Sequence, residues 1–147
     1  MLHSVHIHHP IRAVSAALAR GFREWFPDLD GASPPAGGQR VVEIGIQKKL
    51  SVEFGEPVAA GSWTEVPISW KAASVHELFP IMTGKVEVAP VDGRNTQLTV
   101  CGTYQPPLDR LGKYLDDALM HKVAEATVKD LAESLALGIE TLVRSDG

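Results

Sequence analysis

Alternation between apolar and polar side chains is the clearest pattern in the first part of the chain. In the stretch HSVHIHH, Val5 and Ile7 share one face, whereas His6 and His8 share the other. A period of two is typical of a strand that is buried on one side. Pro10 ends the pattern, since proline cannot donate a hydrogen bond to a neighbouring strand. A short strand is therefore expected here.

The next segment changes to helical spacing. In IRAVSAALARGFREWFPDLDG the apolar residues recur every three or four positions, with Gly21 in the middle. This pattern predicts two short helices, about residues 11–20 and 22–29, with a bend at the glycine. Residues 30–39 are rich in glycine and proline and are expected to form a loop.

Alternation returns after this loop and predicts an antiparallel sheet. The expected strands cover residues 40–47, 49–57, 62–72, 85–91 and 95–105. The sequence DGRN between the last two strands is typical of a hairpin turn. Pro67 indicates an edge or a bulge in its strand, because its nitrogen carries no proton. Residues 74–84, SVHELFPIMTG, have no clear period and are expected to be irregular or a short helical turn.

One long helix is expected from residue 108 to about residue 144. Its apolar row recurs every four residues and comprises Leu111, Leu115, Leu119, Val123, Thr127, Leu131, Leu135 and Ile139. A spacing of four drifts against the period of an α-helix, so the buried face rotates along it. Such a helix is expected to lie diagonally across a twisted sheet. The order of elements predicts one α+β domain, residues 1–147, with a space between sheet and helix that could hold a ligand.

Composition narrows the classes of partner. The net charge is −4, with both signs mixed along the chain. Nucleic acid is therefore not an expected partner, since phosphate binding needs a concentrated basic face. Cys101 is the single cysteine, which excludes an intrachain disulfide. Neither a signal peptide nor an apolar run long enough for membrane insertion is seen, and a soluble cytoplasmic protein is expected.

Two segments carry a resemblance to a known superfamily. One is EVPISWKA followed by LFPIMTGKVEVAPVDGRNTQL, and the other is TQLTVCGTYQPPLDRLGKYLDDALMHKVAEATVKDL. With the order of elements, they make the chain resemble the START-like helix-grip superfamily (SRPBCC), which includes polyketide cyclase/dehydrase-like and lipid-transfer proteins. The resemblance implies a curved antiparallel sheet of about six or seven strands around a long C-terminal helix, with two short helices after the first strand. It also implies a hydrophobic or amphipathic small molecule bound between sheet and helix.

The strand face that would line this groove is apolar. By alternation it carries Val42, Ile44, Ile46, Leu50, Val52, Phe54, Thr64, Val66, Ile68, Trp70, Val86, Val88, Leu98, Val100 and Tyr104. None of these is charged, so Tyr104 is the plausible titratable group facing a ligand, with Thr64 second. A filled hydrophobic core would show the same pattern. The expected ligand-binding residues are Phe54, Val66, Ile68, Trp70, Phe79, Met82, Val100, Tyr104, Leu119 and Val123, with Phe79 and Met82 reaching the groove from a loop.

The histidines near the start are not expected to bind metal. His6 and His8 have a spacing that can chelate zinc or iron, but no third ligand is close in sequence, and both are expected to face solvent. His3 and His9 fall on the core side at the ends of the strand. No metal and no cofactor are predicted.

No other residue is expected to be catalytic. His121 is expected on the polar side of the long helix, in a solvated row with Glu125, Lys129 and Glu133. Cys101 lies on the strand face opposite the apolar one, and no electropositive neighbour that would activate its thiol is evident.

Three functions remain open. The first is binding or carrying of a lipid, polyketide or similar apolar metabolite. The second is a polyketide cyclase/dehydratase-like enzyme in which Tyr104 orients a substrate carbonyl. The third is an interaction protein with a filled core, for which an exposed Trp63 would be the best indication. The apolar groove favours the first, and the lack of an inward charge counts against the enzyme.

Overall fold

The computed structural model of the chain describes residues 1–20, 39–44, 48–72, 81–105 and 117–146, and of residues 39–44, 48–50, 72, 117–120 and 146 only the backbone. The second short helix expected at residues 22–29 lies outside the described residues. So do most of the glycine- and proline-rich segment and the expected beginning of the long helix at residues 108–116.

Seven strands form one antiparallel sheet. They are β1 Leu2–Ile7, β2 Gln39–Ile44, β3 Lys48–Phe54, β4 Val58–Ala60, β5 Trp63–Ala72, β6 Ile81–Pro90 and β7 Thr96–Gln105. The spatial order is β1-β7-β6-β5-β3-β2, and the short β4 pairs with β5 beside β3. The prediction of an antiparallel sheet of six or seven strands is confirmed.

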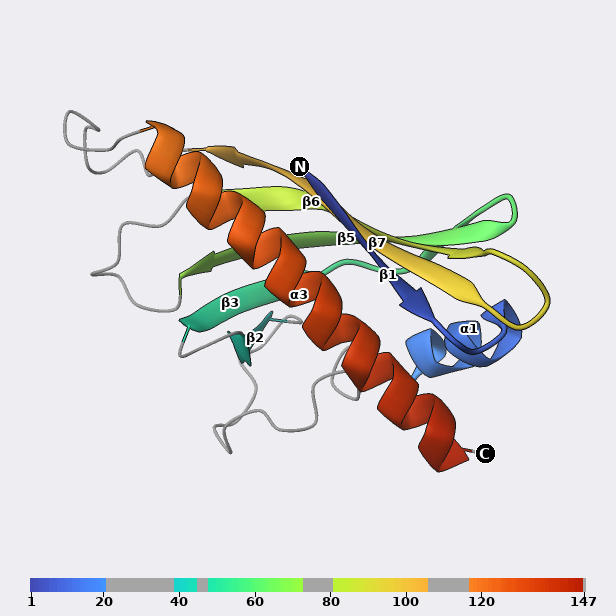
Figure 1. Ribbon diagram of the computed structural model, residues 1–147. Helices are drawn as coiled ribbons and strands as arrows, with labels where there is room; N and C mark the ends of the chain where they lie inside the picture. Colours follow the sequence, from blue (N-terminus) through green and yellow to red (C-terminus); the bar gives the residue numbers. More distant parts are fainter. Residues whose placement is uncertain (21–38, 45–47, 73–80, 106–116, 147) are drawn as a thin grey trace.

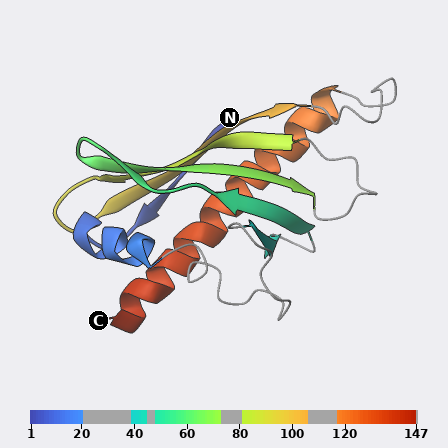
Figure 2. The ribbon, with the colours of Figure 1, turned by 180° about the vertical axis from the view of Figure 1, so that it is seen from behind.

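A single long helix, α3 (Asp117–Asp146), crosses this sheet diagonally (Figure 1). It contacts β1, β7 and β2. A shorter helix, α1 (Ile11–Ala19), follows β1 and packs against α3 and β6 near the C-terminal end of α3. In the view from behind, the strands pass in front of the helix (Figure 2).

The core lies between the sheet and the two helices. The buried apolar residues of the sheet are Ile7, Val52, Phe54, Val66, Ile68, Trp70, Met82, Val86, Val88, Leu98 and Val100. They are met by Val14, Ala17 and Leu18 of α1 and by Ala124, Val128, Leu131, Ala132, Leu135, Ala136, Ile139 and Leu142 of α3. Each fully buried leucine or isoleucine stabilises the fold by about 1.5–3 kcal/mol. The alternation in the strands and the row of four-residue spacing from Thr127 to Ile139 are therefore confirmed as the buried faces.

Two predictions about strand boundaries were wrong. The strand expected over residues 49–57 ends at Phe54, and residues 58–60 form a separate short strand, β4. Residues 81–84, expected to be irregular, are the first residues of β6. Met82 lies opposite Trp70 of β5 and opposite Tyr104 of β7, so this end of β6 is paired on both sides. Pairing of both edges outweighs the local tendency of Gly84 to interrupt a strand. Met82 accordingly reaches the core from β6 and not from a loop.

Pro67 lies inside the sheet, at a point where no neighbouring strand needs a hydrogen bond from its backbone nitrogen. Its carbonyl accepts a hydrogen bond from the N–H of Gly55, 2.8 Å away, so its nitrogen faces the same side. That side is the interval between the end of β3 and the beginning of β4, where no residue of β3 or β4 pairs with Pro67. The irregularity that the sequence indicated at Pro67 is therefore present. It is a gap in the pairing along one edge of β5, between the residues that pair with β4 and those that pair with β3.

Candidate ligand-binding site

A row of four side chains crosses the inner face of the sheet at one end. Val52 of β3 lies opposite Trp70 of β5, Trp70 lies opposite Met82 of β6, and Met82 lies opposite Tyr104 of β7. The first three are buried, whereas Tyr104 is half-buried and packs against the edge of the core. The row therefore leads from the interior of the fold toward its surface.

Trp70 connects the sheet to α3. Its ring is 1% exposed, and its Nε1–H donates to the hydroxyl of Thr127 on α3, 3.2 Å away. That hydroxyl in turn donates to the carbonyl of Ala124, 2.9 Å away. The buried indole N–H thus has an acceptor, and the buried threonine hydroxyl has both a donor and an acceptor, within an otherwise apolar layer. Buried polar groups in proteins are hydrogen-bonded in this way.

A glycine of β7 leaves room for the Trp70 ring. A Cβ atom at Gly102 would lie 3.1 Å from Cη2 of Trp70 and 3.1 Å from the carbonyl oxygen of Thr83. Both distances are tighter than most real Cβ contacts, so a side chain here would push the ring away from the sheet. The indole therefore lies across β6 and β7, over a position that has no side chain.

The predicted ligand-binding residues fall on this inner face as far as they are described. Phe54, Val66, Ile68, Trp70, Met82 and Val100 are buried there, and Tyr104 and Val123 are half-buried. Phe79 and the side chain of Leu119 lie outside the described residues. The inner face gathers the apolar groups, and its solvent-facing end is marked by Tyr104 on the sheet and Val123 on the helix.

A polar cluster at this end was missed by the sequence analysis. The rings of Tyr104 and His121 lie edge to face, with centroids 6.2 Å apart. Nε2 of His121 is 2.7 Å from Oε1 of Glu125, one turn further along α3, and both side chains are about half exposed. The pairing of His121 with Glu125 was expected from their spacing, but the contact with Tyr104 was not.

A spacing in the sequence could have indicated this contact. At about 100° per residue, positions seven and eighteen residues apart return to nearly the same side of a helix. His121 therefore shares the side of Val128 and Ile139, both of which are buried. The solvated row of His121, Glu125, Lys129 and Glu133 is confirmed, since all four are exposed, but the row did not indicate the contact with Tyr104.

His6 and His8 lie on the outer face of β1 and beside its end, and are exposed as expected. Their rings are 4.7 Å apart. Nε2 of His6 is 3.0 Å and Nδ1 of His8 is 3.3 Å from the amide oxygen of Asn95. Among the side chains that the structure describes, no three histidine, cysteine or acidic residues converge on a metal position. The absence of a bound metal stays a prediction, which elemental analysis of the untagged protein tests.

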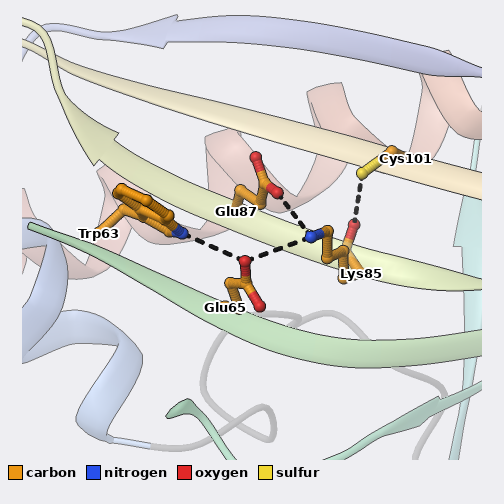
Figure 3. Close-up of polar contacts among 5 residues, drawn as sticks. All are labelled: Trp63, Glu65, Lys85, Glu87 and Cys101. Carbon is orange, nitrogen blue, oxygen red and sulfur yellow. Dashed lines mark hydrogen bonds and ion pairs between the residues drawn. The ribbon is translucent and has the colours of Figure 1, made fainter. Parts of the chain in front are cut away.

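The outer face of the sheet carries an ionic ladder (Figure 3). Glu65 of β5 lies directly opposite Glu87 of β6, an arrangement that is unfavourable for two like charges. Lys85 relieves it, with Nζ 3.2 Å from Glu65 and 2.9 Å from Glu87. The indole N–H of Trp63 also donates to Glu65, 3.1 Å away. Trp63 is 41% exposed, which is the feature that the alternative of an interaction protein required.

These contacts shift the pKa values of two charged groups in the ladder. The hydrogen bonds from Trp63 and then from Lys85 lower the pKa of Glu65. The hydrogen bonds to Glu87 and then to Glu65 raise the pKa of Lys85. Burial raises the pKa of Cys101, whose Sγ lies 3.8 Å from the carbonyl oxygen of Lys85. A thiol that is kept protonated is a weak nucleophile, which agrees with the passive role expected for Cys101.

The structure also has a depression of about 500 Å³ on its surface, between the first residues of β1 and α3. It is lined by Met1, Leu2, His3, Lys122, Glu125, Ala126, Val128 and Lys129. Glu125 connects this depression to His121 and, through it, to Tyr104. His3 lies on the core side of β1, as predicted, with Nε2 3.7 Å from a carboxylate oxygen of Glu133.

Comparison with known proteins places this architecture. No family model and no curated protein matches the sequence. Among solved structures, a START superfamily protein from Mycobacterium smegmatis aligns over 100% of this chain and 98% of its own, with a TM-score of 0.57 and 15% identity. The chain has the START-like helix-grip fold. This confirms the resemblance drawn from the sequence as far as the fold is concerned.

Two further solved structures are similar to the chain over almost their full length. Norcoclaurine synthase from Thalictrum flavum has a TM-score of 0.58 at 11% identity, covering 99% of this chain and 94% of that one. A conserved protein from Geobacillus kaustophilus has a TM-score of 0.57 at 13% identity, covering 99% and 95%. Among the described residues, no helix is both long and apolar enough to cross a membrane.

Proposed function

We propose that this helix-grip protein binds or carries a hydrophobic small molecule, of the lipid or polyketide kind, between the sheet and α3. The observation that supports this most is the composition of the inner face. Among the strand residues that face α3 and whose side chains the structure describes, none is an aspartate, glutamate, lysine or arginine. Arg40, opposite Val52, and Lys48, opposite Ile44, share this face by register, and their side chains are outside that set. An apolar lining with a few polar groups is typical of small-molecule sites in proteins.

The position of α1 favours a ligand at the end of the space between sheet and α3 that lies away from α1. Val14 and Leu18 of α1 are fully buried against the core near the C-terminal end of α3, so that end is filled by side chains. At the other end the inner row runs out to Tyr104, and the helix presents Val123, which is half-buried. We place the ligand at this second end, with Met82 and Trp70 as its inner wall.

Tryptophan fluorescence tests the proposal, because the chain offers a matched pair. Trp70 is fully buried on the inner face, and Trp63 is exposed on the outer face. A ligand against the inner wall changes the surroundings of Trp70 and leaves those of Trp63 as they were. A panel of long-chain fatty acids, fatty alcohols and polycyclic aromatic compounds is titrated into the wild type, Trp70→Phe and Trp63→Phe.

The proposal predicts a saturable change in emission for at least one class in the panel. Trp70→Phe should lose most of the change, and its affinity should fall by about 1–3 kcal/mol if the ring contacts the ligand. Trp63→Phe should keep both the change in emission and the affinity of the wild type. Loss of the response in Trp63→Phe alone would place the ligand on the outer face. A flat response across the panel, with a clean ligand-free mass from native mass spectrometry, would favour a filled core with no ligand.

A further inference from the structure

The cluster of Tyr104, His121 and Glu125 stands at the end of the inner face where the proposed ligand would meet solvent. The hydroxyl of Tyr104 makes no hydrogen bond within the part of the chain that the structure describes. Its ring packs against the core and lies in an edge-to-face arrangement with the ring of His121. A half-buried phenol fixed by packing in this way holds its hydroxyl in one place, available as a donor and as an acceptor.

Glu125 determines which nitrogen of His121 carries the proton. The carboxylate of Glu125 can only accept, and it lies 2.7 Å from Nε2 of His121. In the neutral imidazole the proton is therefore on Nε2, which leaves Nδ1 with a free lone pair. No hydrogen bond to Nδ1 is formed by any described residue. The cluster thus combines a phenolic donor with an imidazole acceptor.

We propose that this cluster holds a hydroxyl group at one end of an otherwise apolar ligand. A hydroxyl is the small group that meets both needs at once: its oxygen accepts from Tyr104, and its proton is donated to Nδ1 of His121. This inference rests on the proposed function, because it concerns one end of the same ligand. It narrows the ligand class to apolar alcohols and phenols.

The same chemistry distinguishes a hydroxyl from related groups. A ketone, an ether or a carboxylate can accept from Tyr104 but has no proton for Nδ1 of His121, so one of the two bonds is lost. The loss of one neutral hydrogen bond lowers affinity by about three- to tenfold. Glu125 acts as a positioning residue, since it contacts His121 and not the ligand.

The test uses two pairs of compounds. Within each pair, the hydroxyl proton of one compound is replaced by a methyl group in the other. The pairs are 2-naphthol with 2-methoxynaphthalene, and 1-decanol with decyl methyl ether, and affinities are measured by equilibrium dialysis. The wild type should prefer the hydroxyl member by about three- to tenfold. His121→Leu should bring that preference close to one, because the hydroxyl proton then has no acceptor. Tyr104→Phe should weaken both members of each pair alike and keep the preference, because the hydroxyl and the ether oxygen both accept from Tyr104. His6→Leu, the same substitution on the outer face, should leave it unchanged.

Glu125 is tested by a rescue series. Glu125→Gln keeps an oxygen that accepts from Nε2 of His121 and should keep the preference, whereas Glu125→Leu should reduce it. Circular dichroism confirms that each variant is folded. Equal affinities within both pairs, or binding of none of the four compounds, would overturn the hydroxyl site. The groove itself is judged separately by the fluorescence panel, so a response there with no hydroxyl preference refutes this inference alone.

Discussion

The hydrogen bond between Trp70 and Thr127 gives the sharpest test of how the sheet and α3 are joined. In Thr127→Val the side chain keeps its shape but loses the hydroxyl that accepts from the indole, 3.2 Å away. The indole N–H is buried, so it would be left without a partner. A buried donor with no acceptor costs about 1–3 kcal/mol. At about 2–4 °C per kcal/mol for a domain of this size, a loss of 2 kcal/mol lowers Tm by about 4–8 °C.

Thr141→Val is the matched control for this substitution. Thr141 lies in the same helix, and its hydroxyl donates to a backbone carbonyl one turn earlier, as that of Thr127 does. It is exposed, however, so its replacement should change stability by less than about 0.5 kcal/mol. Urea unfolding followed by circular dichroism measures both variants.

A double-mutant cycle isolates the bond itself. When both partners are replaced by apolar groups, no buried donor is left unsatisfied. In a Trp70→Phe background, the cost of Thr127→Val should therefore fall close to zero. The coupling energy, which is the difference between the two costs, should therefore be about 1–3 kcal/mol. An equal cost of Thr127→Val in both backgrounds, or a cost equal to that of Thr141→Val, would refute the bond as a link between sheet and helix.

Three further predictions follow from contacts elsewhere in the sheet. Gly102→Ala should cost about 1–3 kcal/mol in urea unfolding, because its Cβ would crowd Trp70, whereas Gly93→Ala, with nothing within 4 Å, should cost little. Cys101 should react with iodoacetamide at neutral pH more slowly than free cysteine, since burial raises its pKa; a faster rate would contradict this. The pKa of Glu65 is lowered in the folded state, so the stability that this carboxylate contributes is present above its unfolded pKa and is lost as the pH falls through its folded pKa. Glu65→Gln should therefore show a shallower loss of stability in acid than the wild type, and identical acid profiles would argue against the ladder.

The faces of the strands could be predicted from the sequence because alternation has a physical cause. Residues two apart in a strand lie on the same side, so burying one side leaves a period of two in the side chains. In β6 and β7 this gave the inward positions of Val86, Val88, Leu98 and Val100, all of which are buried. The helix was predicted for the same reason, with Thr127 correctly placed in its buried row.

Contacts between distant elements could not be predicted in this way. The partner of Trp70 is 57 residues further along the chain, and its identity depends on where α3 crosses β5. The contact of Tyr104 with His121 depends on the same crossing. The beginning of β6 at Ile81 was missed because a local pattern cannot show that both edges of a segment are paired. Register and crossing position are properties of the assembled sheet.

The pairing of β1 with β7 also sets a constraint on how the chain reaches this structure. Ser4 bonds to Thr99 across a separation of 95 residues, whereas β5 and β6, or β6 and β7, are neighbours in sequence as well as in space. Closing a long loop costs more conformational entropy than forming a hairpin, and folds with many distant contacts fold more slowly. During synthesis, β1 leaves the ribosome long before its partner exists. Its apolar face, with Val5 and Ile7, must wait until β7 has been made, which makes this edge strand the segment most in need of protection while the chain is still growing.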